Sequence, residues 1–329
     1  MGRYVVRRLL WVVLVLLIIT FVTYVIFFTL PPGDPAVRLA GKQPTPSLIA
    51  EVKKQLGLDK PAILAWPPWD SQYGIFVRHL LTGDQCGKPG LGKSYDSKTC
   101  VKDEIKDRAP KTISLALGAA VVWLLMGIPI GIVSALKRRS LADRLAMGFA
   151  LFGISAPVFW LALIFLFIFW QKLGIGAVGS GYVDLHSDPL HWFTHLLLPW
   201  FALALLYAAF YARMTRGNLV ETMGEDYIRT ARAKGLSERK VVMKHGLRSS
   251  LTPVVTIFGM DVALLIGGAV ITETVFNLQG LAAWAATSAV RSDLPAVLGV
   301  TVVLAVSVTL MNVIVDILYA YLDPRVRYS

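Results

Sequence analysis

The sequence predicts an all-α, polytopic membrane protein, on the evidence of its composition, its apolar segments and the placement of its basic residues. Of its 329 residues, 55% are hydrophobic and 16% are charged, which lies outside the range of ordinary soluble domains. Six segments are long enough to cross a hydrocarbon layer of about 30 Å, which takes about twenty helical residues. The predicted spans cover residues 9–30, 113–136, 145–170, 191–212, 251–272 and 296–322.

The first of these spans resembles a secretory signal in position but not in length. Its 22 apolar residues exceed the core of an ordinary signal sequence, and five more spans follow it. We therefore interpret residues 1–30 as a cytoplasmic N-terminus followed by an uncleaved first transmembrane helix.

Basic residues predict the orientation of the chain, because short cytoplasmic loops retain Lys and Arg. With the N-terminus inside, the inner segments carry 18 of the 33 Lys and Arg residues, and the two short outer loops carry two. Both termini are then cytoplasmic. Residues 31–111 form an extracytoplasmic insertion between spans one and two, 112–322 the transmembrane core with a cytoplasmic loop at 213–250, and 323–329 a cytoplasmic tail. The net charge of +12 mostly reflects this topology, so we predict a lipid bilayer and no nucleic acid as partner.

The predicted outer segment contains both cysteines of the chain, Cys86 and Cys100. On the oxidising side of a membrane, two cysteines separated by 13 residues predict a disulfide, which would contribute about 3 kcal/mol in the chain-entropy model. Two free thiols are the alternative. The same segment has a helical pattern over residues 47–56.

One motif in this segment is misleading. The stretch from Gly87 to Ser94 reads GKPGLGKS and satisfies the phosphate-loop pattern GxxxxGK[ST]. That site needs a strand before the loop and a helix after it, so that backbone amides converge on the phosphates. Here the loop lies between two cysteines, on the side of the membrane that lacks ATP. We therefore predict no nucleotide site.

Few residues within the spans carry chemistry. Asp261, in span five, is an intramembrane carboxylate, which either lines a transport pathway or makes a structural hydrogen bond. His191 and His195 are one helical turn apart, a spacing that can bind metal. No Glu follows His191 as a metalloprotease helix would require, and both histidines lie at the predicted outer interface near Trp192. We therefore expect them to pack at the membrane interface and predict no metal site. Gly153 and Pro157 predict a bend in span three.

The cytoplasmic loop contains a charged stretch that we predict to form two short helices. Met223, Tyr227 and Ala231 recur every fourth residue, which predicts one apolar helix face. Gly235 is placed to end this helix in the left-handed conformation. Ser237 is placed to cap a second helix, whose apolar residues are Val241, Val242 and Leu247.

This charged stretch is either a docking surface or a basic loop held near anionic lipid. The small residues Ala231 and Ala233 would let another protein approach closely. Arg229, Arg232 and Lys234 would surround that contact with charge.

The stretch EDYIRTARAKGL, residues 225–236, followed by Arg248 and Pro253, resembles the cytoplasmic EAA loop of ABC importer permeases. It is most similar to the loop of the dipeptide and oligopeptide B subunits, the OppB and DppB type. The similarity extends over nearly the whole chain and includes these further motifs: PGDP at 32–35, LGLDKP at 56–61, YARMTR at 211–216, GGAVITETVF at 267–276 and DPRVR at 323–327.

The chain departs from the family pattern in three places. The EAA triplet is replaced by residues 229–231, RTA, as in the peptide and nickel branch. The usual PGLG after the GGAVITETVF motif is QGLA at 279–282. The cysteine loop resembles an insertion into the family's GDLGxSY segment, which accounts for the false phosphate loop.

The resemblance implies the type I ABC importer permease fold, with this chain as half of a translocation pore for di- or oligopeptides. The partners would be a homologous C-type permease, two ABC ATPase subunits or a fused ATPase, and an extracytoplasmic substrate-binding protein. ATP and Mg would be bound by the ATPases, so no cofactor and no enzymatic activity are predicted for this chain. It would lie in a bacterial cytoplasmic membrane. The alternatives are a permease for nickel chelates or another small solute, and a self-sufficient secondary transporter.

The resemblance also implies which residues couple transport to ATP hydrolysis. The predicted ATPase-coupling residues are Glu225, Asp226, Tyr227, Arg229, Thr230, Ala231, Ala233, Lys234 and Gly235.

Overall fold

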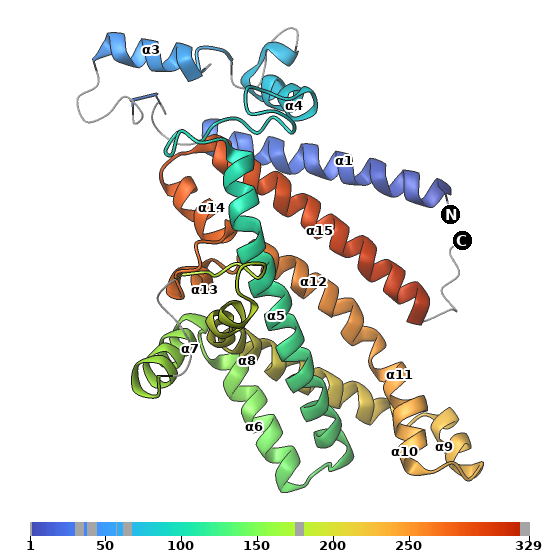
Figure 1. Ribbon diagram of the computed structural model, residues 1–329. Helices are drawn as coiled ribbons and strands as arrows, with labels where there is room; N and C mark the ends of the chain where they lie inside the picture. Colours follow the sequence, from blue (N-terminus) through green and yellow to red (C-terminus); the bar gives the residue numbers. More distant parts are fainter. Residues whose placement is uncertain are drawn as a thin grey trace. The chain divides into compact units, whose positions relative to one another are not determined.

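The computed structural model describes residues 2–29, 36–37, 45–56, 58–61, 68–174 and 181–322 (Figure 1). Within these ranges the regular elements are helices, and extended pairing is limited to two isolated β-bridges. The predicted PGDP motif at 32–35, part of LGLDKP at 56–61 and the tail at 323–329 lie outside the described residues. The chain divides into two compact units, Met1–Pro110 with Leu281–Thr309, and Lys111–Gly280 with Leu310–Ser329.

The first unit contains the N-terminal helix, the predicted outer segment and the start of the last helix. Its helices are α1 (Gly2–Tyr24), continued by a π-helical turn at Val25–Thr29, then α3 (Pro46–Leu56), α4 (Gln72–Thr82), the start of α5 (Val101–Leu136), α14 (Leu281–Val290) and the start of α15 (Leu294–Leu322). The helix predicted at residues 47–56 is confirmed by α3. Helix α4, which the sequence analysis did not predict, begins after Ser71, whose hydroxyl accepts a hydrogen bond from Gly74 N at 3.0 Å.

Two small apolar clusters hold this unit together. In one, Leu91 from the cysteine loop packs with Val101 and Ile105 of α5, Leu281 of α14 and Val300 of α15. In the other, the buried residues Tyr24, Leu294 and Leu298 join α1 to α15. The cysteine loop is therefore packed onto helices rather than projecting freely.

The second unit contains the rest of the helices and the larger core. These helices are the remainder of α5, α6 (Leu141–Ser155), α7 (Val158–Phe165) with a π-helical extension at Leu166–Lys172, α8 (Pro189–Thr222), α9 (Asp226–Ala233), α10 (Glu238–Lys240), a π-helical turn at Val241–Gly246, α11 (Leu247–Ser250), α12 (Thr252–Gly268), α13 (Val270–Val275) and the end of α15. Trp123 and Tyr211 are the largest fully buried side chains of this core.

Helices α5 and α8 approach each other closely along small residues. A β-carbon added at Gly127 would lie 2.8 Å from Ala208 O, and one added at Gly131 would lie 2.6 Å from Ala212 O. Glycine four residues apart on one face allows such backbone approach, which is a common way of packing helices in membranes. The GxxxG spacing within α5 thus fixes its contact with α8.

The predicted spans agree in place with the helices but not in continuity. By length and composition, α5, α8 and residues Leu294–Ile314 of α15 could each cross a membrane unbroken. Two further candidates are bent pairs, Leu141–Ser155 with Val158–Lys172 at 105° and Glu238–Ser250 with Thr252–Gly267 at 48°. In the described residues the count reaches at most five, with a shorter apolar helix at Val13–Phe27.

The bend in the third predicted span is much sharper than a kinked helix. Helix α6 ends at Ser155, Ala156 caps it in an extended conformation, and Pro157 precedes α7. Because proline has no backbone N–H and disfavours a helical residue before it, the helix stops here and restarts in a new direction. The bend predicted in the span over residues 145–170 is therefore present at Pro157, as a break of 105° between two helices.

Candidate functional site

The predicted coupling segment is a short helix on a folded base. Helix α9 follows an extended Glu225 and ends before Gly235, whose φ of 75° is the left-handed conformation predicted for it. Its buried residues Ile228 and Ala231 pack against Val241, with Met223 and Leu236 partly buried beside them. Because Ile228 and Ala231 are three residues apart, they form one inward face of the helix.

The structure corrects three details of the sequence analysis. The predicted apolar face of Met223, Tyr227 and Ala231 is wrong at Tyr227, which is 44% exposed. Ala231 is buried, and Met223, which precedes the start of α9 at Asp226, packs beside it. Ala231 lies on the buried face, so it cannot be a surface for another protein. Ser237 precedes α10 but its side chain makes no capping hydrogen bond.

The remaining predicted coupling residues lie on the surface together. The exposed ones are Glu225, Asp226, Tyr227, Arg229, Thr230, Ala233, Lys234 and Gly235. Arg232 donates to both carboxylate oxygens of Glu238, at 3.1 and 2.7 Å, and links α9 to α10. Its guanidinium lowers the pKa of the Glu238 carboxyl, mainly through these hydrogen bonds. The arrangement is a small, charged helix face that no other described part of the chain covers.

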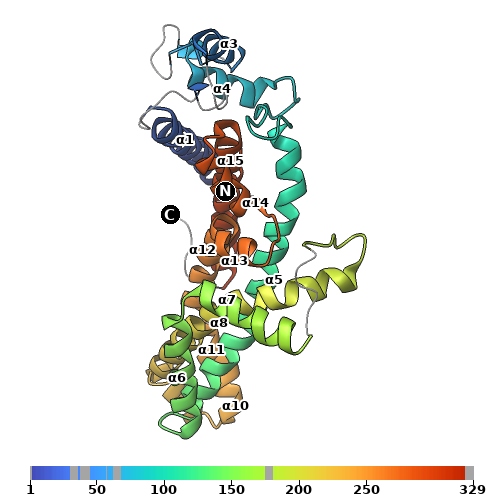
Figure 2. The same cartoon turned by 90° about the vertical axis from the view of Figure 1, so that its left-hand side faces the viewer.

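The base below α9 connects this surface to the long helices. Leu219 of α8, Val242 and Leu247 form a buried cluster, against which Ile132 and Ala135 of α5 pack. Figure 1 and Figure 2 both place α9 to α11 at the end of the second unit where α5 turns into α6. A displacement of α9 would therefore be transmitted to α5 and α8.

A buried ion pair at this end was missed by the sequence analysis. Asp143 accepts hydrogen bonds from Arg216 Nε at 2.6 Å and Nη2 at 2.9 Å, from Ser134 Oγ at 2.5 Å and from Arg139 N at 2.8 Å. The Asp143 side chain is 7% exposed and that of Arg216 is 25% exposed. The pair joins α6 to α8 next to the base of α9. Arg216 is part of the YARMTR motif, and this motif is the sequence feature that could have pointed to the ion pair.

The predicted intramembrane carboxylate, Asp261, is brought close to aromatic residues of α8. Tyr211 Oη donates to Asp261 Oδ2 at 2.8 Å. Tyr211 is fully buried, and Asp261 is partly exposed. The structural hydrogen bond therefore exists, and the exposed part of the carboxylate leaves room for a second role.

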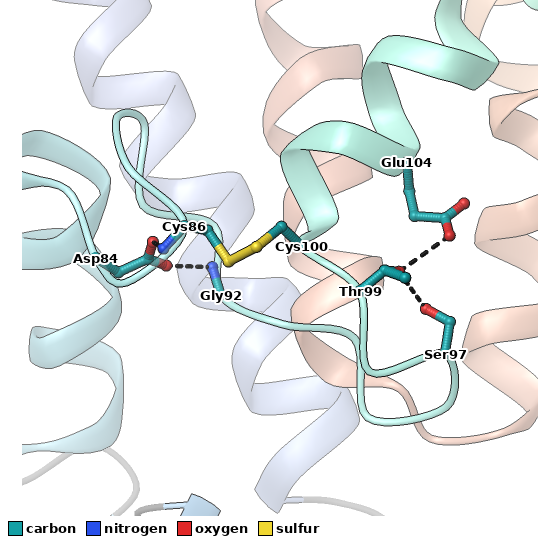
Figure 3. The surroundings of a disulfide bond; sticks show 7 residues. All are labelled: Asp84, Cys86, Gly92, Ser97, Thr99, Cys100 and Glu104. Carbon is teal, nitrogen blue, oxygen red and sulfur yellow. Dashed lines mark hydrogen bonds between the residues drawn. A yellow bond between two sulfur atoms is a disulfide. The ribbon is translucent and has the colours of Figure 1, made fainter.

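The cysteine loop is a closed structure stabilised by carboxylates. The Sγ atoms of Cys86 and Cys100 are bonded, and the Asp84 carboxylate accepts from Cys86 N at 2.7 Å and Gly92 N at 2.6 Å (Figure 3). Ser94 Oγ donates to the buried Asp293 carboxylate at 2.5 Å. The Gly92 amide and the Ser94 hydroxyl of the phosphate-loop pattern thus bind carboxylates of the protein itself, and helix α4, not a strand, precedes the loop.

The disulfide gives a direct prediction. We expect a non-reduced proteolytic digest of the membrane-expressed protein to contain one peptide pair linked through Cys86 and Cys100. Replacing both cysteines by Ser should lower the free energy of unfolding by about 3 kcal/mol, because the loop gains freedom in the unfolded chain. Mass spectrometry that finds both residues as free thiols would contradict the bond.

The two histidines are held locally. His191 Nδ1 lies 2.7 Å from Asp188 Oδ2, and His195 Nδ1 lies 2.7 Å from the carbonyl oxygen of His191. In the described part of the chain, no three His, Cys, Asp or Glu side chains are grouped as metal ligands.

Comparison with known proteins identifies the family. Residues 127–328 match the family described as "Binding-protein-dependent transport system inner membrane component", and residues 1–116 match the N-terminal region of such membrane components. The chain belongs to this family. The permease is accordingly a multi-pass membrane component of a binding-protein-dependent transport system.

Curated relatives match the permease from end to end. It is 38% identical to a putative peptide transport system permease protein of Brucella abortus strain 2308 over 329 residues, with 100% of both chains covered. It is 35% identical over 352 residues to the dipeptide transport system permease protein DppB of Escherichia coli K12, and 37% identical over 350 residues to DppB of Alkalihalophilus pseudofirmus, again with full coverage of each chain.

A solved structure supports the fold. The MetNI methionine ABC transporter in an inward-facing conformation aligns with a TM-score of 0.52 at 18% identity, covering 68% of this chain and 97% of that chain. The permease thus has the helical fold of a type I ABC importer subunit.

Proposed function

We propose that this chain is the permease subunit of an ATP-driven peptide importer, in which it forms half of the translocation pore. A homologous C-type permease would form the other half, and an extracytoplasmic binding protein would deliver di- or oligopeptides. Two ABC ATPase subunits, or a fused ATPase, would bind ATP and Mg on the cytoplasmic side of a bacterial cytoplasmic membrane. Full-length similarity to permeases named for peptide transport supports this cargo.

The observation that carries the proposal is the α9 surface. Its exposed residues face away from the protein, and its buried residues Ile228 and Ala231 attach it to α8 and α5 through a packed base. A partner that binds this helix can therefore move the membrane helices as rigid bodies. ATP binding would draw the two ATPases together, pull α9, and switch the pore from inward-facing to outward-facing.

The proposal is tested by reconstituting the complete transporter in proteoliposomes and measuring peptide uptake. Uptake should require ATP inside, the binding protein outside and both ATPases. Uptake by this chain alone, without the ATPases, would contradict the proposal and favour a self-sufficient secondary transporter.

Gly235 tests the coupling surface specifically. Gly235→Val should reduce uptake and the co-purification of the ATPases, because a β-branched residue at a φ of 75° strains the end of α9 by about 1–2 kcal/mol. Gly235→Asn should be milder, since Asn tolerates this conformation.

Gly217→Val is the matched control for this substitution. Gly217 is exposed within α8, its φ is that of a helix, and an added β-carbon meets nothing within 4 Å. The Gly217→Val variant should therefore leave uptake nearly unchanged. Unaltered coupling of the Gly235→Val transporter in an intact complex would refute the role of Gly235.

A further inference from the structure

The carboxylate of Asp261 has no cationic partner in the membrane part of its unit. Its hydrogen bond comes from the neutral Tyr211 hydroxyl, and no ion pair of Asp261 occurs among the described residues. Residues 112–136, 189–212 and 252–268 contain no Lys or Arg. In its ionised form, this carboxylate needs a counter-charge that the unit does not supply.

The position of Asp261 along α12 disfavours lipid as its surroundings. It is nine residues after Thr252, the start of α12, which corresponds to about 14 Å of helix and so to the middle of the hydrocarbon layer. It is partly exposed and lies beside the exposed side chains of Met260 and Leu264. Because an unpaired carboxylate at this depth needs water or protein next to it, this edge of α12 should border the pathway rather than the acyl chains.

Aromatic rings complete the surroundings of the carboxylate. Tyr207 and Tyr211 are four residues apart on one face of α8, and both contact Trp123, with ring centroids at 4.5 and 5.9 Å. Trp123 Nε1 is buried and has no hydrogen-bond partner in the described chain. Because Trp123 is fully buried, it supports the two tyrosine rings and does not itself face the pathway. A carboxylate beside aromatic rings is the combination that binds ammonium groups.

We propose that Asp261, oriented by the buried Tyr211 and flanked by the partly exposed Tyr207, binds the α-ammonium group of the peptide during its passage through the membrane. This inference rests on the proposed function, which supplies a cargo carrying such a group. The same charge repels the peptide's terminal carboxylate, so the site favours one orientation of the peptide. With a single carboxylate in a partly exposed site, the peptide is held weakly enough to leave.

The test is ATP-driven uptake in proteoliposomes by the complete transporter with Asp261→Asn. Asn keeps an acceptor for the Tyr211 hydroxyl and removes only the charge. Two peptides shown to bind the binding protein are compared at saturating concentration, one with a free amino terminus and one blocked as pyroglutamyl. We expect uptake of the free peptide to fall about tenfold, which corresponds to the loss of one charge-assisted hydrogen bond. Uptake of the blocked peptide should change less than about twofold.

Two control variants separate charge from structure. Asp261→Glu should retain most of the uptake, and Asp103→Asn, at an exposed carboxylate in the first turn of α5, should change neither peptide's uptake. Equal losses for both peptides, or no loss for either, would overturn the inference. Loss of the second permease from purified Asp261→Asn complexes would also overturn it, by assigning the charge to a pair between subunits. A wild-type complex without ATP-dependent uptake of the free peptide would instead refute the proposed function.

Discussion

Replacing Asp143 by Ala is expected to lower the free energy of unfolding of the permease by about 3 kcal/mol, because it leaves the partly buried Arg216 guanidinium without its counter-charge. Two hydrogen bonds from Arg216 and one each from Ser134 and the Arg139 amide are lost together. Thermal unfolding of the detergent-solubilised protein measures the change. For the Asp143→Ala variant, the amount of protein that remains monodisperse after heating should be lower than for the wild type.

The paired substitution Asp143→Leu with Arg216→Met is the control for this prediction. It removes both charges and fills similar volume, so it should recover much of the lost stability. Asp226→Ala is a second control, because the Asp226–Arg229 pair is fully on the surface and such pairs contribute about 0–1 kcal/mol. An Asp143→Ala protein as stable as the wild type would show that Arg216 finds water, and that the pair is not a structural element.

How much of the structure could be predicted from the sequence depends on how far apart in the chain the interacting residues lie. The helices and the end of α9 at Gly235 follow from local patterns, namely apolar segments and the conformational freedom of glycine. The orientation of Tyr227 was not accessible in this way, since the packing of Ile228 and Ala231 against Val241 decides which face of α9 turns inward. The 105° break at Pro157 exceeds the bend that a proline alone predicts, and depends on packing around α7.

Interactions between distant residues were outside the reach of sequence patterns. Asp143 and Arg216 are 73 residues apart, and Ser94 and Asp293 are 199 apart. Each of these residues appears in the sequence as an ordinary polar residue near the end of a helix or in a loop. Asp261, in contrast, could be recognised from the sequence, because a carboxylate within an apolar span is costly wherever its partner lies. That its partner is Tyr211 could be seen only from the packing of α8 against α12.

The second large effect is expected at Ile228, the residue that fastens α9 to its base. Ile228→Ala removes a fully buried side chain that packs on Val241, and such a truncation costs about 2–4 kcal/mol where it occurs. Because α9 has only eight residues and two buried side chains, the loss should open α9 locally rather than unfold the long helices. Amide hydrogen exchange should then rise in residues 226–233 and stay unchanged in α5 and α8.

The functional consequence separates anchoring from contact. Ile228→Ala should lower ATP-driven uptake about tenfold or more, since a helix that opens cannot transmit a pull from the ATPase to α8. Tyr227→Ala, at the exposed neighbour, should leave hydrogen exchange in α9 unchanged, because surface truncations usually change stability by less than about 0.5 kcal/mol. Tyr227→Ala should lower uptake by weakening the contact with the ATPases, so that less ATPase co-purifies with the permease. If Ile228→Ala loosened α9 while uptake stayed normal, the coupling path would have to pass through another part of residues 213–250, of which the exposed Arg248 and Met243 are the next to be tested.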